Sequence, residues 1–212
     1  MTTATDLQKN RLLFVVSAPS GTGKTSLCTK VLSRVSQLAF SISHTTRPPR
    51  PGEVAAKNYH FVSKDAFTRY LKESRMAEWT EKYGNYYGTT KETIQEAFNR
   101  GYDLLFDIDE RGGRQLADAY QDVVTILVLP PSLAVLQKRL VDRGTDDPEA
   151  VAKRLKKATE EIKTMSWYRY VIINDTFDDA VNKLQSIIVA ERCRHGHHYI
   201  EDILNNDGSG KK

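Results

Sequence analysis

The stretch from Leu12 to Thr25, LLFVVSAPSGTGKT, contains the residues whose types and order most clearly predict chemistry. A short apolar run precedes a loop with two glycines, the pair Lys24 and Thr25 follows, and the next residues have a helical pattern. A glycine-rich backbone lets several N–H groups point at one spot, and a helix start adds free N–H groups with partial positive charge. Lys24 adds a mobile charge for the outer phosphates, and the Thr25 hydroxyl suits Mg²⁺. The order of strand, loop, Lys-Thr and helix therefore predicts a P-loop, which binds a nucleoside triphosphate.

One position of this loop departs from the usual pattern G-x-x-x-x-G-K-[ST]. Ala18 stands where the pattern has its first glycine. Alanine fits there if its φ angle is negative, because only a positive φ strongly favours glycine, which has no Cβ. We therefore expect the whole loop to bind the triphosphate, through Ala18, Pro19, Ser20, Gly21, Thr22, Gly23, Lys24 and Thr25.

Two acids follow a second apolar run, in the sequence LLFDID. Asp107 lies at the C-terminal end of the run, where an aspartate of P-loop proteins faces the Mg²⁺ shell. Asp109 comes two residues later, and residues two apart on an extended chain point to the same side. Two neighbouring carboxylates repel unless a cation or a proton donor lies between them. We predict that one faces the metal and the other a donor on a ligand, with Thr25 and Asp107 as the metal candidates.

The composition limits the classes of protein that fit the chain. Its 212 residues, 40% of them hydrophobic, suffice for one α/β core with small inserted subdomains. The net charge of +4 suits a small polyanion as well as nucleic acid. Two cysteines, Cys28 and Cys193, without a spacing motif indicate neither a disulfide framework nor a zinc site. No apolar stretch has the length of a membrane span and the N-terminus lacks the apolar region of a signal peptide, so we expect a cytoplasmic protein without a membrane partner.

The elements that must position these residues alternate between strands and helices, which predicts an α/β fold with a parallel sheet wrapped by helices. The expected strands cover residues 12–16, 40–44, 59–62, 78–82, 104–108, 123–129 and 170–173. The expected helices cover residues 26–36, 64–73, 91–100, 112–120, 132–142, 149–165 and 177–193. The segment GNYYGTT is expected to be a turn, and residues 38–90 form an aromatic-rich insertion between two βα units.

Segments spread along the chain resemble the guanylate kinase family. In order they are SAPSGTGKTS, SISHTTRPPRPGE, YHFV, EWTEKYGNYYGTT, DIDERGG, RLVDRGTDD and INDTFDDA. The likeness covers residues 11 to about 192, and the combination of SHTTRPPRPGE with GNYYG is highly specific. It implies transfer of a phosphoryl group from ATP to GMP, and to deoxy-GMP, with Mg²⁺, in purine nucleotide metabolism and GMP recycling.

The resemblance also implies how the chain is divided. A P-loop core with a three-layer parallel-sheet structure carries a β-rich GMP-binding subdomain and a helical lid. The core covers residues 11–37 and 91–192, the GMP-binding subdomain about 38–90 and the lid about 139–157. Residues 1–10 are expected to be a flexible N-terminus and residues 193–212 a polar C-terminal tail. The tail histidines His195, His197 and His198 have no metal-ligand pattern around them, so we interpret them as a surface turn.

The same resemblance assigns a set of residues to the GMP site: Ser43, Arg47, Arg50, Tyr59, Glu78, Tyr87, Thr89 and Asp109. Two guanidinium groups in a proline-rich loop suit a phosphate dianion, to which the tyrosine hydroxyls also donate. Guanine presents two adjacent donors, its ring N–H and its exocyclic amine, so Glu78 is the best base reader, with Asp109 assisting. Adenine has an acceptor at that ring position and would leave Glu78 unpaired, so such a site rejects it.

Arginines of the lid and its flanks complete the expected site. Arg139 and Arg143 lie four apart on one helix face. With Arg154 they are expected to close over the bridging phosphates and offset charge in the transition state. Asn174 is expected to border the adenine. The residues expected to act in catalysis are Lys24, Arg47, Arg139, Arg143 and Arg154.

A few charged residues have no assigned role. Arg111 stands where the family commonly has glutamine, and it could pair with Asp107 or Asp109 or point to solvent. We interpret Lys153, Lys156 and Lys157 as surface charge.

Three other functions stay open on the sequence. One is a different nucleoside monophosphate kinase, which the acids suited to guanine disfavour. Another is a guanylate-kinase-like module that binds peptides without catalysis, which the intact Lys24, Thr25 and Asp107 disfavour. The third is nucleic-acid binding, for which the chain has neither a basic stripe nor a recognition motif. The sequence leaves open whether the protein is a monomer or a homo-oligomer.

Overall fold

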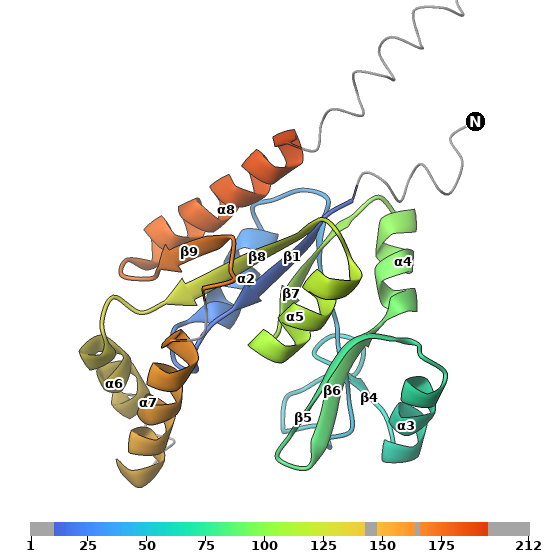
Figure 1. The fold of residues 1–212 in the computed structure, drawn as a ribbon, viewed down its shortest axis with the longest axis horizontal. Helices are drawn as coiled ribbons and strands as arrows, with labels where there is room; N and C mark the ends of the chain where they lie inside the picture. The colour runs from blue at the N-terminus through green and yellow to red at the C-terminus, as the bar shows by residue number, and fades with distance from the viewer. Residues whose placement is uncertain (1–10, 143–147, 164–165, 195–212) are drawn as a thin grey trace, which may run out of the picture.

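A computed structural model describes residues 11–142, 148–163 and 166–194 of the protein. Five of the strands in these ranges form one sheet in the order β2-β7-β1-β8-β9, and every neighbouring pair is parallel (Figure 1). The strands are β1 (Leu13–Ser17), β2 (Leu38–Phe40), β7 (Asp103–Asp107), β8 (Val123–Leu129) and β9 (Tyr170–Ile173). The central strands are nearly continuous runs of apolar residues, as expected where both faces of a parallel sheet are covered. The predicted α/β class is confirmed.

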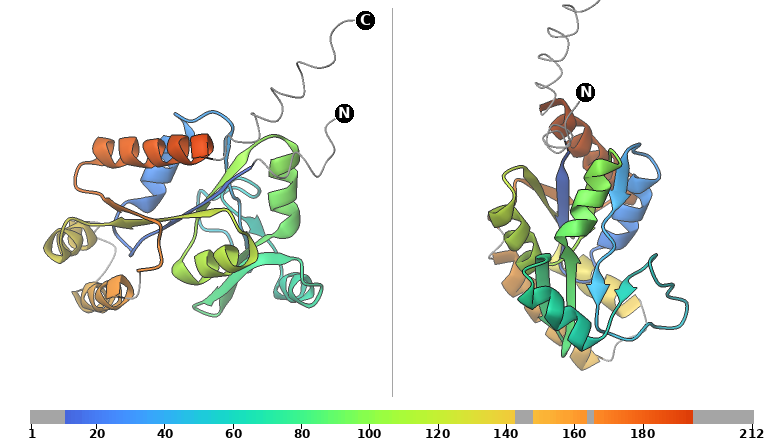
Figure 2. Two further views of the ribbon diagram at one scale, coloured as in Figure 1. Left: turned by 45° about the horizontal axis from the view of Figure 1, so that its top comes forward. Right: turned by 90° about the vertical axis from the view of Figure 1, so that its right-hand side faces the viewer.

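Helices cover the two faces of this large sheet (Figure 2). Alternate residues of β1 point to opposite faces, so Phe14 packs in one core cluster and Val15 in the other. Helices α2 (Lys24–Leu32) and α8 (Phe177–Arg194) pack on the Phe14 face. Helices α4 (Lys91–Asn99) and α5 (Glu110–Ala119) pack on the Val15 face. The resulting three layers hold the C-terminal ends of β1 and β7 fixed, and the P-loop and Asp107 follow from those ends.

A second, smaller sheet has the strand order β4-β3-β6-β5. Its strands are β3 (His44–Thr45), β4 (His60–Phe61), β5 (Met76–Lys82) and β6 (Asn85–Thr90), and α3 (Lys64–Lys72) lies beside it. A two-residue turn joins β5 to β6, with positive φ at Tyr83 (51°) and Gly84 (73°), as a tight hairpin requires. The side chain of Gln115 on α5 donates to the Trp79 carbonyl at 2.7 Å and accepts from the Trp79 N–H at 3.0 Å. The small sheet is thereby bonded to the core through β5.

Two expectations about this region were wrong. The predicted strand 40–44 is divided, because β2 ends at Phe40 in the large sheet and β3 begins at His44 in the small one. Strand β2, within the range of about 38–90 expected for the insertion, thus belongs to the large sheet. The segment GNYYGTT is mostly strand β6 and not a turn. An alternating pattern shows that a chain is extended, but it does not show with which strand the chain pairs.

Helices α6 (Leu133–Asp142) and α7 (Pro148–Lys163) pack together beyond the end of β8 (Figure 1). Leu136, Leu140, Val151 and Ala158 form their shared apolar cluster. Arg143, residues 1–10 and the histidines of the tail lie outside the described residues. None of the helices in the described ranges combines the length and the apolar character that a membrane span requires.

Candidate active site

The P-loop connects the end of β1 to the start of α2. Gly21 and Gly23 have φ angles of 94° and 87°, in the region where a Cβ is unfavourable. The Thr22 hydroxyl donates to the Pro19 carbonyl at 2.9 Å and closes the loop on itself. Ala18 is not among the residues with positive φ. Its Cβ is therefore compatible with the loop, and the departure from the glycine pattern leaves the backbone intact.

Lys24, Thr25 and Asp107 form one connected group at the ends of β1 and β7. The Lys24 Nζ lies 2.6 Å from Asp107 Oδ1 and donates to the Ile108 carbonyl at 3.0 Å. The Thr25 hydroxyl donates to Asp107 Oδ2 at 2.7 Å. A hydroxyl and a carboxylate are thus neighbours beside the phosphate-binding loop, and both are oxygen ligands that suit Mg²⁺. Among the described residues, no cluster of three or more His, Cys, Asp or Glu side chains could hold a metal ion.

Asn174 follows β9 and holds the P-loop from behind. Its side chain is buried, and its Nδ2 donates to the Thr22 carbonyl at 2.6 Å. Its own carbonyl accepts from the Arg139 guanidinium at 3.0 Å. The side-chain amide of Asn174 therefore already bonds the protein backbone, and its contact with the adenine stays a prediction. Arg139 is tied to the same corner of the core.

The small sheet, α3 and the loops that connect them are called the small domain here. Its expected phosphate-binding residues lie around the loop after β3. The Arg47 guanidinium makes two bonds of 2.8 and 2.9 Å to Glu53, which also accepts from the Arg50 N–H at 2.7 Å. The same guanidinium lies over the Tyr59 ring, 5.5 Å from its centre. Tyr59 and Tyr87 have their ring centres 6.1 Å apart. Glu53 was not predicted as a site residue, although its position in PRPGE just after the two arginines is a signal that the sequence offers.

Glu78 is a buried carboxylate with an unsatisfied oxygen. Its side chain is on β5 and only 2% exposed, and Oε1 has no hydrogen-bond partner. Burial raises the pKa of Glu78 to about 7, and the neighbouring charge of Asp109 adds to the rise, while Thr89 and Lys82 oppose it. A Cβ at position 112 would come within 2.5 Å of Glu78 Oε2, so Gly112 is what lets α5 pass this close.

Thr89 and Ser43 lie near Glu78 in the small sheet. Thr89 is paired with Glu78 across β5 and β6, and its hydroxyl lies 3.3 Å from that of Ser43. A carboxylate, two hydroxyls and the start of α5 thus converge at one place.

Asp109 has a separate set of partners from Asp107. Its Oδ1 accepts from the Gly112 N–H at 3.1 Å and caps α5, and its Oδ2 lies 2.8 Å from Lys82 Nζ. Burial alone would raise the pKa of Asp109, but Lys82 and the cap outweigh it and hold the pKa below its ordinary value. Strand β7 ends at Asp107, so the extended geometry assumed for the two acids does not continue. Lys24 forms an ion pair with Asp107 and Lys82 forms one with Asp109, and Arg111 takes part in neither pair.

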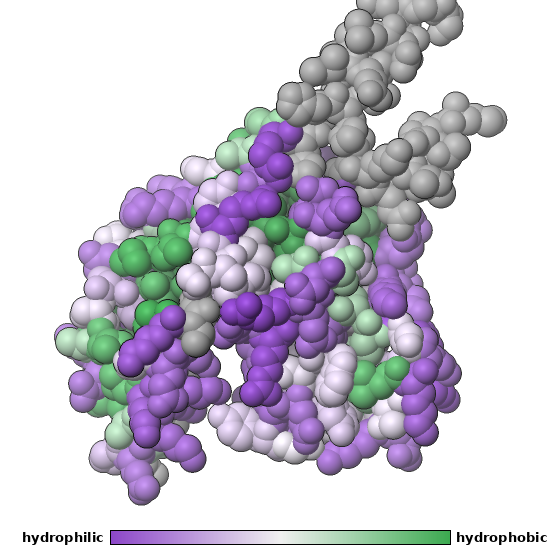
Figure 3. Space-filling view, viewed as in Figure 1, coloured by the Kyte–Doolittle hydropathy of each residue, from purple (hydrophilic) through white to green (hydrophobic). Residues whose placement is uncertain are grey.

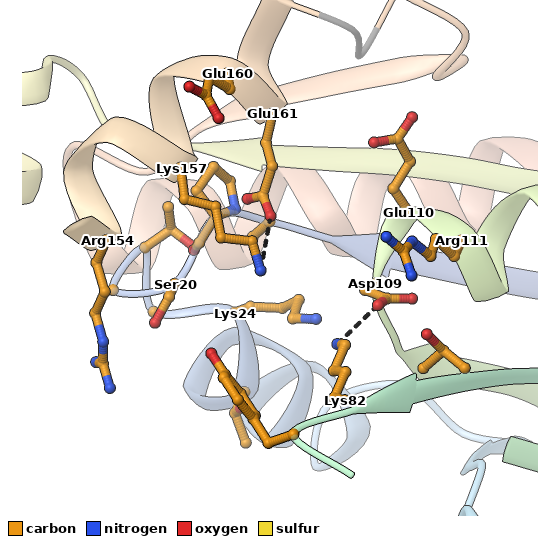
Figure 4. A pocket seen from close by; sticks show the side chains of 18 of the residues that line it. Ser20, Lys24, Lys82, Asp109, Glu110, Arg111, Arg154, Lys157, Glu160 and Glu161 are labelled. Carbon is orange, nitrogen blue, oxygen red and sulfur yellow. Dashed lines mark hydrogen bonds and ion pairs between the residues drawn. The ribbon is translucent and has the colours of Figure 1, made fainter. Parts of the chain in front are cut away.

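A pocket of about 900 Å³ separates the P-loop from the small sheet and α7. It is lined by the P-loop, by β5 from Thr80 to Lys82, by Asp109 and by Arg154 and Lys157 of α7. The space-filling view shows the hollow between α7 and the small sheet, with hydrophilic residues around it (Figure 3). Lys157 is 65% exposed, as expected for surface charge, and it also lines the pocket, where its Nζ lies 3.6 Å from Glu161 (Figure 4). The rotation of α7 about its axis, which the sequence does not reveal, turns this exposed lysine toward the pocket.

These features define a P-loop nucleotide-binding protein of the α/β class. A family model described as "Guanylate kinase" matches residues 10–191. The chain is 45% identical to a guanylate kinase of Geobacter sulfurreducens and 46% identical to one of Syntrophotalea carbinolica. Each alignment covers 89% of this chain, and it covers 93% and 90% of the respective relative. The crystal structure of guanylate kinase from Anaplasma phagocytophilum superposes with a TM-score of 0.69 at 29% identity, over 87% of both chains. The chain belongs to the guanylate kinase family, and the protein is an ATP:GMP phosphotransferase.

Proposed function

We propose that the protein phosphorylates GMP, and deoxy-GMP, with Mg²⁺-bound ATP across the pocket described above. One observation carries the proposal: the P-loop and Asp109 with the end of β5 line the same pocket. A triphosphate on the loop and a base beside β5 would therefore meet in the same pocket. The relatives reported above are named as kinases, which favours the enzyme over the peptide-binding module.

ATP is assigned to the P-loop side of the pocket. The proposed set is residues 18–25 together with Asn174. Lys24 and the loop N–H groups bind the phosphates, since the helix start and the ammonium both attract anions. Thr25 and Asp107 would hold Mg²⁺, which fits because their oxygens already lie together. Bound Mg²⁺ supplies charge neutralisation to the outer phosphates.

GMP is assigned to the small-sheet side. Arg47, Arg50, Tyr59 and Tyr87 bind its phosphate, and Ser43, Glu78, Thr89 and Asp109 bind its base. The guanine edge carries one ring N–H and two amine N–H groups. The carboxylate of Glu78 takes the ring N–H and one amine N–H, and Asp109 accepts the other. The buried acceptor Oε1 of Glu78 then gains a donor, whereas adenine has an acceptor at that ring position.

The transfer step demands positioning more than covalent chemistry from the protein. The attacking GMP phosphate oxygen is already anionic, so no general base is required. Lys24, Arg47, Arg139 and Arg154 offset the repulsion between two polyanions and the charge of the transition state. Arg143 belongs to the same proposed set but lies outside the described residues. We expect the lid, residues 139–157, and the small domain to close on the core and exclude water.

The test is ADP production in a coupled assay with ATP and Mg²⁺, comparing GMP with AMP, CMP and UMP. Activity with GMP and little with the others is expected. Activity that favours another monophosphate would overturn the base assignment, and folded protein without activity on any of them would overturn the proposed function. Omission of Mg²⁺, with chelator present, is expected to abolish turnover.

We propose that the reaction takes place in the cytoplasm and belongs to purine nucleotide metabolism. The partners we propose are the two nucleotides, with no nucleic-acid or membrane partner for this pocket. Size-exclusion chromatography with light scattering will distinguish a monomer from a homo-oligomer.

A further inference from the structure

Lys82 connects the two sheets at the wall of the pocket. It is the last residue of β5 in the small sheet, and its Nζ lies 2.8 Å from Oδ2 of Asp109 in the core. Figure 4 shows this ion pair reaching across from the strand to the start of α5. The side chains of Lys82 and Asp109 are 41% and 26% exposed, so the pair faces the pocket rather than the interior.

The two bonds of Asp109 fix its orientation. The α5 cap holds Oδ1 through the Gly112 N–H, and Lys82 holds Oδ2. A carboxylate oxygen has two lone pairs, so each oxygen keeps an acceptor position after making one bond. A further donor can therefore join the carboxylate without displacing Lys82. The ion pair thus orients an acceptor and leaves it available.

Lys82 also lies where two acids approach each other. Gly112 donates to Asp109, and its Cα faces Glu78 so closely that a Cβ would come within 2.5 Å of Oε2. Both carboxylates therefore lie against Gly112, and neighbouring carboxylates repel each other unless a cation offsets their charge. Lys82, which forms the described ion pair with Asp109, supplies such a cation. It lies on the same strand as Glu78.

We propose that Lys82 is a positioning residue for guanine recognition, holding Asp109 as the acceptor for the second N–H of the exocyclic amine. The inference rests on the proposed binding of GMP on the small-sheet side. Lys82 itself does not touch the base: it acts through Asp109. Lys82 therefore strengthens only the binding of the exocyclic amine. A purine without that amine gains no affinity from Lys82.

The experiment compares GMP with IMP, whose base lacks the exocyclic amine, by equilibrium titration and by kcat/KM. Lys82→Met removes the charge at similar length, Lys82→Arg keeps the charge, and Lys64→Met removes an exposed lysine of the same small domain as the control. An ion pair this exposed is worth little, so we expect K82M to weaken GMP binding only about fivefold. IMP binding and the KM for ATP should stay within about twofold of wild type. K82R should restore most of the loss for GMP, and K64M should match wild type.

Several results would overturn the proposal. Unchanged GMP binding in K82M shows that Asp109 needs no positioning. Tighter GMP binding shows that Lys82 competes with guanine for the carboxylate. Equal losses for GMP and IMP, with a lower melting temperature, show a purely structural role. Wild-type protein that phosphorylates no GMP refutes the proposed function itself, and this control separates that failure from a failure of the Lys82 assignment.

Discussion

The two sides of the pocket differ in how the protein satisfies their charged groups. On the P-loop side, Lys24 and Thr25 both bond Asp107, and Asn174 bonds the Thr22 carbonyl. On the small-sheet side, Glu78 lies on the strand whose residues 80–82 line the pocket, and it is buried with an oxygen that has no hydrogen-bond partner. On the first side, the named polar groups bond to one another within the protein. This side therefore presents the same arrangement of charges to any phosphate. The second side has an acceptor that finds no donor within the described residues, so we propose that selectivity among substrates belongs there.

The largest expected effect is on the P-loop side. Lys24→Met removes the charge that we propose contacts the transferred phosphate, so kcat/KM should fall about a thousandfold with every nucleotide acceptor. The coupled assay at saturating GMP measures it. Lys30→Met, on the exposed part of the same helix, is the matched control and should behave as wild type. A K24M enzyme within fivefold of wild type would contradict the assigned role.

A smaller but selective effect is expected at Glu78. Glu78→Gln replaces one acceptor oxygen by an N–H donor facing guanine's own donors, so kcat/KM for GMP should fall about a hundredfold. The KM for ATP should not change, because ATP is assigned to the other side. Glu96→Gln, at an exposed position of α4, controls for loss of a carboxylate. A loss shared equally by ATP and GMP would remove the contrast between the two sides.

The pH dependence of GMP binding sharpens the same contrast. Burial raises the pKa of Glu78 to about 7, Asp109 adds to the rise, and Thr89 and Lys82 oppose it. Guanine needs the carboxylate form, so binding should be about tenfold tighter at pH 8 than at pH 6 from this group alone. ATP binding should lack this contribution. Titration calorimetry at both pH values measures it, with E78Q as the reference because the GMP phosphate also titrates near pH 6.

The same pKa sets a pH dependence of stability in the unliganded protein. A folded-state pKa above the unfolded one means that the folded protein binds the proton more tightly. The stabilisation is therefore present below the ordinary glutamate pKa and is lost as pH rises to about 7. Urea unfolding should show this fall in wild type and not in E78Q. An identical pH dependence of unfolding in both proteins would show that the raised pKa does not belong to Glu78.

The smallest expected effect tests the internal support of the P-loop. Asn174→Ala removes the amide that bonds the Thr22 carbonyl, so the free energy of unfolding should fall by about 1 kcal/mol. The KM for ATP should rise about threefold, while GMP affinity stays constant. Asn99→Ala, at an exposed helix end, serves as the control. A larger effect on GMP than on ATP would show that the two sides are not independent.

The P-loop side could be predicted from the sequence because its parts are contiguous. A strand, the glycines, Lys24 and Thr25 follow one another, and Asp107 is marked by its place at the end of an apolar run. The alternation of strands and helices likewise predicted the large parallel sheet. Local chemistry and local periodicity carry this information.

The small-sheet side could be predicted only in part. The resemblance named Glu78 and Asp109, but Arg111 was considered as a partner of the acids because it is near in sequence. The structure pairs Asp109 with Lys82 instead, since the packing of α5 on β5 brings them together. The burial of Glu78 depends on Gly112 in the same way. Contacts between elements distant in the chain leave no local pattern to read.

The two cysteines differ in chemical accessibility. Cys28 is fully buried in α2 behind the P-loop, and burial raises the pKa of its thiol to about 12. A thiol enclosed and protonated in this way does not react at neutral pH. Cys193, near the end of α8, is exposed. A maleimide fluorophore or spin label should therefore attach to the natural sequence at one position, remote from the P-loop, and leave turnover unchanged.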